Sequence, residues 1–257
     1  MSPKAVERGR LQAFLPPYDE FGDSVDALLY GSEIVPGGAL VWWLVDGVRQ
    51  EGELDRLKAR PFGVPLIVLL PSAAEIHRTF PLLNAVTSLN ARSVLPAVHL
   101  GSPEHLRLVL STPPRSTPDS VCRHLARRGV LRSPAAQREI HRIFELAPEV
   151  PSVTKLAKRM YASRRTLGRH FSGAGLPVPS HWLQFARLLH VCVQLQCDDS
   201  AIFRVATRLG YPDGFTMSNQ MKRMIGYRPS EVRNYLGWEW IVESWLRREA
   251  EAGRVEL

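Results

Sequence analysis

The sequence predicts a chain of two parts, an α/β domain built on a parallel sheet and an all-α domain with two helix-turn-helix units. Three observations lead to this prediction. Apolar, strand-like runs alternate with helical segments over residues 36–111. Strand signals then stop at TPPRSTPD (112–119), which holds three prolines in eight residues. Beyond this break, pairs of short helices occur twice, about 50 residues apart, with one long helix between them.

A chain of 257 residues is long enough for two domains of ordinary size, each with its own core. We expect the α/β domain to occupy residues 1–114 and a helical connector to occupy 115–150. The two helix-turn-helix units should lie in 151–235, joined by a long helix. Residues 236–257 should form a C-terminal helix or tail.

Three strand candidates define the α/β part. ALVWWLV (39–45) and VPLIVLLP (64–71) are almost continuously apolar, which favours strands buried on both faces, and ARSVLPAVHL (91–100) is the third. Segments of helical composition follow them, so the order favours a parallel sheet flanked by helices. These segments are EGELDRLKAR (51–60), SAAEIHRTFPLLNAV (72–86) and SPEHLRLVLS (102–111), where Ser102 is placed to cap the helix; GRLQAFLP (9–16) and DEFGDSVDALLY (19–30) supply one further strand and helix.

Positive charge is concentrated toward the C-terminus. Residues 1–114 carry 10 Lys+Arg and 12 Asp+Glu, a net charge of −2. Residues 115–150 carry 7 and 4 (net +3), and residues 151–257 carry 16 and 9 (net +7), which together give the overall +8. This asymmetry indicates that the C-terminal part meets a polyanion while the N-terminal part has another role.

The lengths of the apolar runs and the number of cysteines indicate the cellular compartment in which we expect the protein. The longest apolar runs are far too short to span a bilayer and the first residues do not resemble a signal peptide, so we expect a cytoplasmic protein with no membrane partner. Three cysteines at these spacings form neither a disulfide framework nor a metal site. Cys192 and Cys197 stand in an apolar helical stretch, where we expect small core residues.

The first helix-turn-helix unit is predicted over residues 152–183. Ser152 is placed to cap the first helix, and Ser163 to cap a second helix after a turn. Leu167 and Phe171 are four residues apart and therefore share the inner face of that second helix. Its opposite face carries basic and hydroxyl side chains: Arg165, Thr166, Arg169 and Ser172.

The second unit ends with LGYPDGFTMSNQMKRMIGYRPSEV (209–232). On a 3.6-residue period, the three methionines at 217, 221 and 224 form an inner stripe, with Ile225 at its edge. Gly210 stands where a tight turn needs a positive φ. Phe215, Thr216, Asn219 and Arg223 point away from the stripe, flanked by Gln220 and Lys222.

The C-terminal part resembles the AraC-type family of bacterial transcription regulators over residues 120–235. The residues that carry this resemblance are spaced motifs in the right order: S-R-R-T-L-x-R-x-F from 163, A-T-R-L-G-Y from 206, Ser218, the K-R pair at 222–223 and G-Y-R-P-S-E-V-R from 226. The middle helix also matches at Arg187. In that family a long helix joins two helix-turn-helix units, so that both recognition helices can enter successive major grooves on one side of the DNA.

The resemblance implies a sequence-specific transcription regulator that binds double-stranded DNA and is not an enzyme. It implies no cofactor and no metal, with RNA polymerase and a second copy of the chain as candidate partners. The family usually has aromatic residues where Met217 and Met221 stand, and often an arginine where Asn219 stands; an amide there would favour adenine over guanine. The expected DNA-binding residues are Ser163, Arg164, Arg165, Thr166, Arg169, Phe215, Thr216, Asn219, Gln220, Lys222 and Arg223.

The N-terminal part resembles a receiver domain of two-component response regulators, with most of its chemistry missing. Asp46 stands where a phosphoacceptor aspartate would, and Ser72 where the switch residue would. The acidic pair that holds Mg²⁺ is absent, and Leu95 replaces the lysine before the proline that follows the last strand. Without that charge stabilisation we expect Asp46 to remain an ordinary strand-end acid, in a degenerate domain used for dimerisation or docking.

Two other function classes compete with DNA reading. An enzyme is disfavoured because the chain has no G-x-S-x-G, H-E-x-x-H or P-loop motif. A non-catalytic interaction protein, derived from such a regulator and binding DNA weakly or non-specifically, is the alternative. The C-terminal WEWIVESWLRREAEAG (238–253) places Trp238, Ile241, Trp245 and Leu246 on one helical face, for which core packing is expected and dimer contact is the alternative.

Overall fold

The computed structural model describes residues 11–44, 51–71, 84, 86–198 and 200–257. The chain divides into two compact units, Met1–Leu110 and Ser111–Leu257. Asp46 and Ser72 lie outside the described residues, so the expectation that Asp46 stays unmodified remains a prediction.

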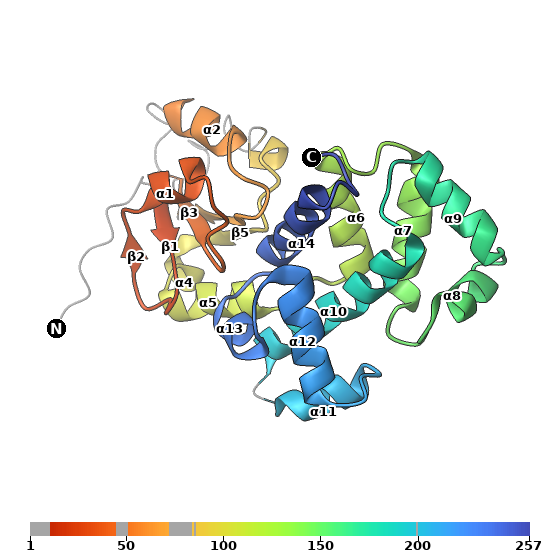
Figure 1. Ribbon diagram of the computed structural model, residues 1–257. Helices are drawn as coiled ribbons and strands as arrows, with labels where there is room; N and C mark the ends of the chain where they lie inside the picture. The colour runs from red at the N-terminus through yellow and green to blue at the C-terminus, as the bar shows by residue number, and fades with distance from the viewer. Residues whose placement is uncertain (1–10, 45–50, 72–83, 85, 199) are drawn as a thin grey trace. The chain divides into compact units, whose positions relative to one another are not determined.

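The N-terminal unit contains a five-stranded sheet in the order β2-β1-β3-β4-β5 (Figure 1). β3, β4 and β5 run parallel to one another, as the strand–helix alternation predicted. β1 pairs antiparallel with β3 and with the two-residue β2, so the sheet is mixed. The strands are β1 (Leu11–Phe14), β2 (Phe21–Gly22), β3 (Ala39–Trp43), β4 (Leu66–Leu70) and β5 (Ser93–Pro96).

The central strands are buried on both faces, which explains their continuous hydrophobicity. All five residues of β3 are buried, as are four of the five of β4. Leu40, Trp42 and Val68 belong to one core cluster, which also contains Leu28 of α1 and Leu57 of α2. β5 lies at the edge of the sheet, and its burial alternates along the strand.

Four helices of this unit are described by their bounds: α1 (Val25–Tyr30), α2 (Glu51–Lys58), α4 (Ala97–Leu100) and α5 (Pro103–Ser111). The helices predicted at 51–60 and 102–111 are confirmed. Ser102 caps α5 as expected, because its Oγ accepts a hydrogen bond from the His105 amide at 3.4 Å. Most of the helix predicted at 72–86 lies outside the described residues.

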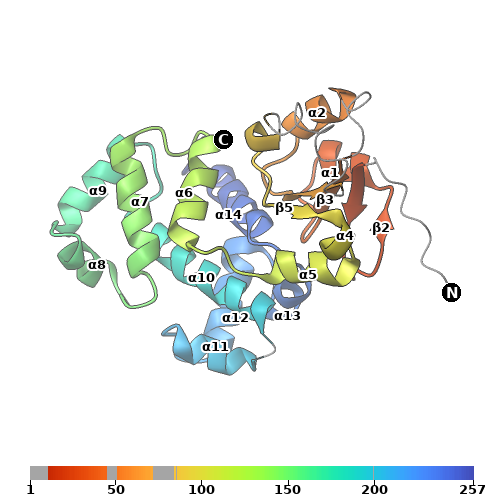
Figure 2. The same cartoon turned by 180° about the vertical axis from the view of Figure 1, so that it is seen from behind.

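The described part of the C-terminal unit is helical (Figures 1 and 2). Its elements are α6 (Thr117–Arg127), α7 (Pro134–Leu146), α8 (Val153–Arg159), α9 (Arg164–Gly173), α10 (Pro179–Cys197), α11 (Ile202–Arg208), α12 (Gly214–Ile225), α13 (Pro229–Asn234) and α14 (Glu239–Glu251). The long helix α10 contacts α7, α8, α9, α11, α13 and α14. It is therefore the scaffold on which both pairs of short helices are mounted.

An aromatic cluster forms the centre of this unit. Phe185 of α10 and Trp245 of α14 stack with ring centroids 4.1 Å apart and an interplanar angle of 5°. Trp182 meets Trp245 edge-on at 4.6 Å, and Phe144 of α7 meets Phe185 edge-on at 6.1 Å. The expected core face of the C-terminal helix is confirmed, because all four of its residues are buried: Trp238, Ile241, Trp245 and Leu246.

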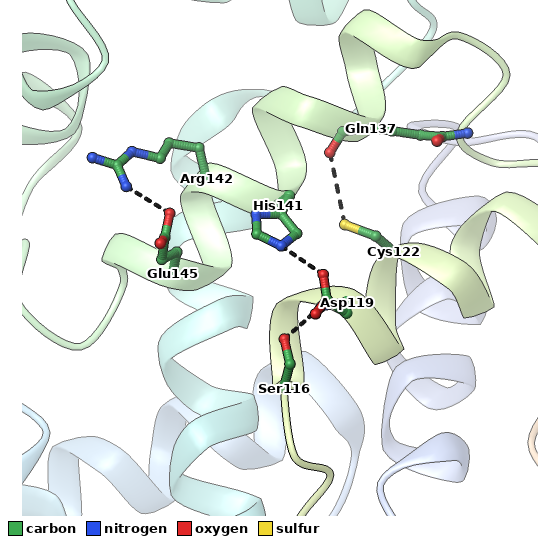
Figure 3. A network of polar contacts seen from close by, with 7 residues as sticks. All are labelled: Ser116, Asp119, Cys122, Gln137, His141, Arg142 and Glu145. Atoms are coloured by element: carbon green, nitrogen blue, oxygen red, sulfur yellow. Dashed lines mark hydrogen bonds and ion pairs between the residues drawn. The ribbon is translucent and has the colours of Figure 1, made fainter.

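Polar contacts join α6 to α7 in this unit (Figure 3). His141 Nε2 lies 2.9 Å from Asp119 Oδ1, and Ser116 Oγ caps α6 by accepting from the Asp119 amide at 3.2 Å. Cys122 Sγ donates to the Gln137 carbonyl at 3.7 Å. Burial, and after it the charge of Asp119, raise the pKa of the Cys122 thiol to about 12, so this cysteine stays a neutral packing residue.

The two remaining cysteines differ from each other. Cys192 is fully buried, as expected of a core cysteine. The same expectation for Cys197 is wrong, because that residue is exposed at the end of α10, where its Sγ donates to the Ser111 carbonyl at 3.0 Å. Cys197 is the last residue of α10, two positions beyond the last buried apolar residue, Leu195, and the composition of the run does not show where the helix end reaches solvent. None of the helices in the described part of the chain has the length and apolar character of a membrane crossing.

Candidate DNA-binding surface

The first helix-turn-helix unit consists of α8 and α9, and both predicted caps are present. Ser152 Oγ accepts from the Lys155 amide at 3.3 Å, and Ser163 Oγ accepts from the Thr166 amide at 3.0 Å. Leu156 of α8 is buried, as predicted. The sequence therefore fixes where each helix of this unit begins and which face turns inward.

The recognition helix α9 has an apolar inner face and a basic outer face. Leu167 and Phe171 are each 1% exposed, and they hold the helix against the rest of the unit. On the opposite side, three arginines are exposed: Arg164, Arg165 and Arg169. Within the described residues, no carboxylate forms an ion pair with these three guanidinium groups. They are therefore available to bind an anion from outside the protein.

Ser163 and Thr166 are tied to each other at the start of α9. Their hydroxyl oxygens lie 2.8 Å apart, in addition to the capping bond. The Ser163 side chain is thus used by the helix itself, while Thr166 is half-buried. Of the expected DNA-binding residues on α9, Arg164, Arg165 and Arg169 have exposed side chains, whereas Thr166 does not.

The second unit consists of α11 and α12. Asp213 caps α12: its Oδ1 accepts from the Thr216 amide at 2.6 Å and its Oδ2 from the Thr216 hydroxyl at 3.2 Å. These bonds, the one from the amide first, lower the pKa of the Asp213 carboxyl below its ordinary value. The carboxylate therefore stabilises the positive end of the α12 dipole over the ordinary pH range.

The inner and outer faces of α12 fall where the sequence predicted them. Its inner stripe is buried and consists of Met217, Met221, Met224 and Ile225. Its exposed side chains are Phe215, Thr216, Asn219, Lys222 and Arg223. The Phe215 side chain is 77% exposed, so it is not part of the hydrophobic core. The structure thus gathers five of the six expected residues of this helix on its open side.

Two polar side chains of α12 are directed along the helix. Gln220 is half-buried, and its Nε2 donates to the sulfur of Met224 at 3.4 Å, so its amide is turned toward the inner stripe. Lys222 is exposed, and its Nζ donates to the Gly226 carbonyl at 2.9 Å. Gln220 is therefore separated from the group on the open face, and Lys222 stands at its C-terminal end.

The turns of the two units have the same hydrogen bonds. Tyr161 N–H donates to the Lys158 carbonyl at 3.2 Å, and Gly210 N–H donates to the Thr207 carbonyl at 3.1 Å. The following amides reach back to Ala157 and Ala206, at 2.9 and 3.0 Å. Both turn residues are left-handed, with φ of 54° at Tyr161 and 78° at Gly210. The repeat seen in the sequence is thus reproduced bond for bond in the backbone.

Tyr161 occupies a position that suits glycine, and we expect Tyr161→Gly to stabilise the unit. A left-handed conformation costs a non-glycine residue about 1–2 kcal/mol, of which the flexibility of glycine in the unfolded chain returns about 0.5–1 kcal/mol. The Tyr161 side chain is 97% exposed, so its removal costs little packing. Chemical denaturation should show a gain of about 0.5–1 kcal/mol.

Gly210→Ala is the matched control, because no atom lies within 4 Å of a Cβ placed there. Only the φ penalty acts, so stability should fall by about 1 kcal/mol. A loss of stability in Tyr161→Gly would contradict the equivalence of the two turns.

Several exposed residues beside the recognition helices were not singled out from the sequence. Arg204, Thr207 and Arg208 are exposed on α11, and the Arg204 guanidinium lies 5.8 Å from the centre of the exposed Phe203 ring. The signal in the sequence was the basic charge of Arg204 and Arg208 in the short helix before α12. These side chains widen the basic surface beyond α12.

The chemistry of the two open faces suits DNA. A guanidinium can donate two hydrogen bonds to the major-groove edge of guanine, and an amide can pair with adenine in the same way. Lysine and arginine also neutralise phosphates, which releases counterions and favours binding. Arg165 and Arg169 present these groups from α9, and Asn219 presents its amide from α12.

Comparison with known proteins agrees with this geometry. Residues 156–235 match a family described as a helix-turn-helix domain, of the AraC type. No curated protein matches the chain in sequence. The matched region runs from α8 through α13 and includes both turns and both recognition helices. Domains of this family are regulatory DNA-binding domains and are generally non-enzymatic. Residues 156–235 are therefore similar to the DNA-binding domain of AraC-type transcription regulators.

Proposed function

We propose that the protein is a sequence-specific regulator that reads two successive major grooves with α9 and α12. The observation that carries this proposal is the duplicated turn: two units share one backbone geometry and each presents a polar, exposed face on its second helix. On B-DNA, two such helices on one side of the duplex would lie about 34 Å apart, one helical turn.

The side chains divide into two roles. Arg165 and Arg169 on α9 and Asn219 on α12 read base edges, because their planar groups can form paired hydrogen bonds. Arg164 and Lys222, with the other exposed cations, contact phosphates and fix the register. Phe215 is placed to touch a thymine methyl group at the start of α12, since it is 77% exposed.

The other segments take supporting roles in this proposal. Residues 1–114 act as a degenerate receiver-like domain for dimerisation or partner docking, and 115–150 as the connector. The segment 236–257 completes the C-terminal core. RNA polymerase is the partner that a bound regulator of this kind would contact. The rival proposal is an interaction protein with weak or non-specific DNA binding, to which the exposed arginines of α9 would contribute without reading bases.

Arg169→Ala should weaken binding to the specific site by about 1–3 kcal/mol and relax the preference at one base pair. The reason is the loss of a paired hydrogen bond to a base, which other sequences do not offer. Competition gel shifts with every single-base variant of the site measure both effects.

Arg132→Ala is the matched control, because it removes one exposed arginine outside the two helix-turn-helix units. It should leave the order of preferred sequences unchanged. If Arg169→Ala lowered affinity equally for all sequences, Arg169 would be a phosphate contact, and base reading by this residue would be refuted.

A further inference from the structure

The C-terminal end of α12 is held by a residue from another helix. α12 ends at Gly226, whose φ of 91° is left-handed and whose amide donates to the Lys222 carbonyl at 3.0 Å. The last carbonyls of a helix have no partner within it. One of them, that of Arg223, accepts a hydrogen bond from Arg248 Nη1 of α14 at 3.2 Å.

The Arg248 guanidinium also covers the turn that follows α12. A Cβ placed on Gly226 would lie 2.8 Å from Arg248 Nη2, so the absence of a side chain there makes room for the guanidinium. A cation at this end of the helix also interacts favourably with its dipole. Two independent features of the sequence, a glycine at 226 and an arginine at 248, thus meet at one point.

α14 is itself firmly placed. Glu243 is 8% exposed, and its two oxygens lie 2.8 Å from His124 Nε2 and 3.4 Å from Arg128 Nε, both of the α6 region. Trp240 Nε1 donates to the Tyr235 carbonyl at 3.2 Å, just after α13. α14 packs against α10 and α12, although it lies outside the region that matches the helix-turn-helix family. It therefore offers a rigid support to the end of α12.

We propose that Arg248 is a positioning residue for the recognition helix α12. It fixes the C-terminal turn of α12, and with it the direction in which Asn219 and Arg223 face. α14 is thereby a working part of the DNA-reading unit, in addition to its place in the core. The proposal rests on the proposed reading of bases by α12, but its effect on the helix can be measured without DNA.

The first test is amide hydrogen exchange of the free, full-length protein. In Arg248→Ala, the amides in the last turn of α12 should exchange about three- to tenfold faster, while those of α9 keep their rates. Arg248→Lys, which keeps a charged donor, should recover part of the protection. Arg132→Ala removes the same charge from an exposed position outside the two helix-turn-helix units and should leave α12 unchanged. Equal exchange in α12 of Arg248→Ala and the parent protein would overturn the proposal.

The second test measures binding to every single-base variant of the site. In Arg248→Ala, the preference at base pairs read by α12 should fall about three- to tenfold, and the preference at those read by α9 should stay. A uniform loss at all sequences would instead make Arg248 a phosphate contact and overturn the proposal. If the parent protein shows no base preference from α12 at all, the proposed function fails, whereas hydrogen exchange still decides the role of Arg248.

Discussion

Trp245→Ala is expected to lower the free energy of unfolding of the C-terminal unit by about 3–5 kcal/mol. Trp245 is 0% exposed, and its ring stacks on Phe185 at 4.1 Å while Trp182 meets it edge-on at 4.6 Å. Alanine would leave a cavity between α10 and α14, and both helices pack around these rings. Since a domain is stabilised by only about 5–15 kcal/mol, this single change would remove a large share of the total.

The measurement is chemical denaturation followed by native-state hydrogen exchange of the α10 amides, which separates this unit from the other. Glu251→Ala, an exposed position on the same helix, should change stability by less than about 0.5 kcal/mol. A loss of under about 1 kcal/mol in Trp245→Ala would contradict a central role of α14 in the core, where Trp245 packs on Phe185 and Trp182.

Phe171→Ala is expected to cost the α8–α9 unit about 3–5 kcal/mol. Phe171 is 1% exposed and, with Leu167, forms the inner face of α9. α9 is short and packs on α8 and α10 through this inner face, so this loss should unfold the pair locally before the rest of the chain. Base reading by α9 should disappear, although none of its outward side chains has been changed.

Phe215→Ala is the matched control, because it deletes the same side chain at a position that is 77% exposed on α12. The free energy of unfolding of Phe215→Ala should differ from that of the parent protein by less than about 0.5 kcal/mol. Hydrogen exchange of α9 and denaturation of both variants make the comparison. Similar losses of stability in the two variants would contradict the assignment of inner and outer faces.

The helix-turn-helix units could be predicted because their information is local. A serine whose Oγ accepts a hydrogen bond from the backbone amide three residues later marks the start of α8 and of α9. Apolar residues at a period of 3.6 mark the inner faces. The methionine stripe of α12 follows the same rule, since any large apolar side chain at that spacing is buried. In the same way, continuous hydrophobicity identified β3 and β4 as central strands.

Features that depend on distant residues could not be predicted. The run at 9–16 predicted a strand, and β1 confirms it. A short apolar run does not show whether its strand pairs parallel or antiparallel with its neighbour, and β1 is antiparallel to β3. The contact of Glu243 with His124 joins residues 119 positions apart. Gln220 was expected on the open side of α12, but the rotation of its side chain toward Met224 depends on packing that a helical period does not contain.

Tyr161 shows where the sequence held a signal that was not used. The two units align with Tyr161 opposite Gly210, so the left-handed turn at Gly210 implied one at Tyr161 as well. A bulky residue there is costly and is normally avoided. Comparing the two copies position by position would have exposed the strain.

The most direct test of the central claim is selection of bound fragments from a random DNA library by the full-length protein, followed by affinity measurement at each base pair. Two blocks of preference are predicted, with centres about 10–10.5 base pairs apart. Arg169→Ala should flatten one block, and Asn219→Ala should flatten the other. A single block, or binding that depends on salt but not on sequence, would contradict the reading of two grooves by α9 and α12.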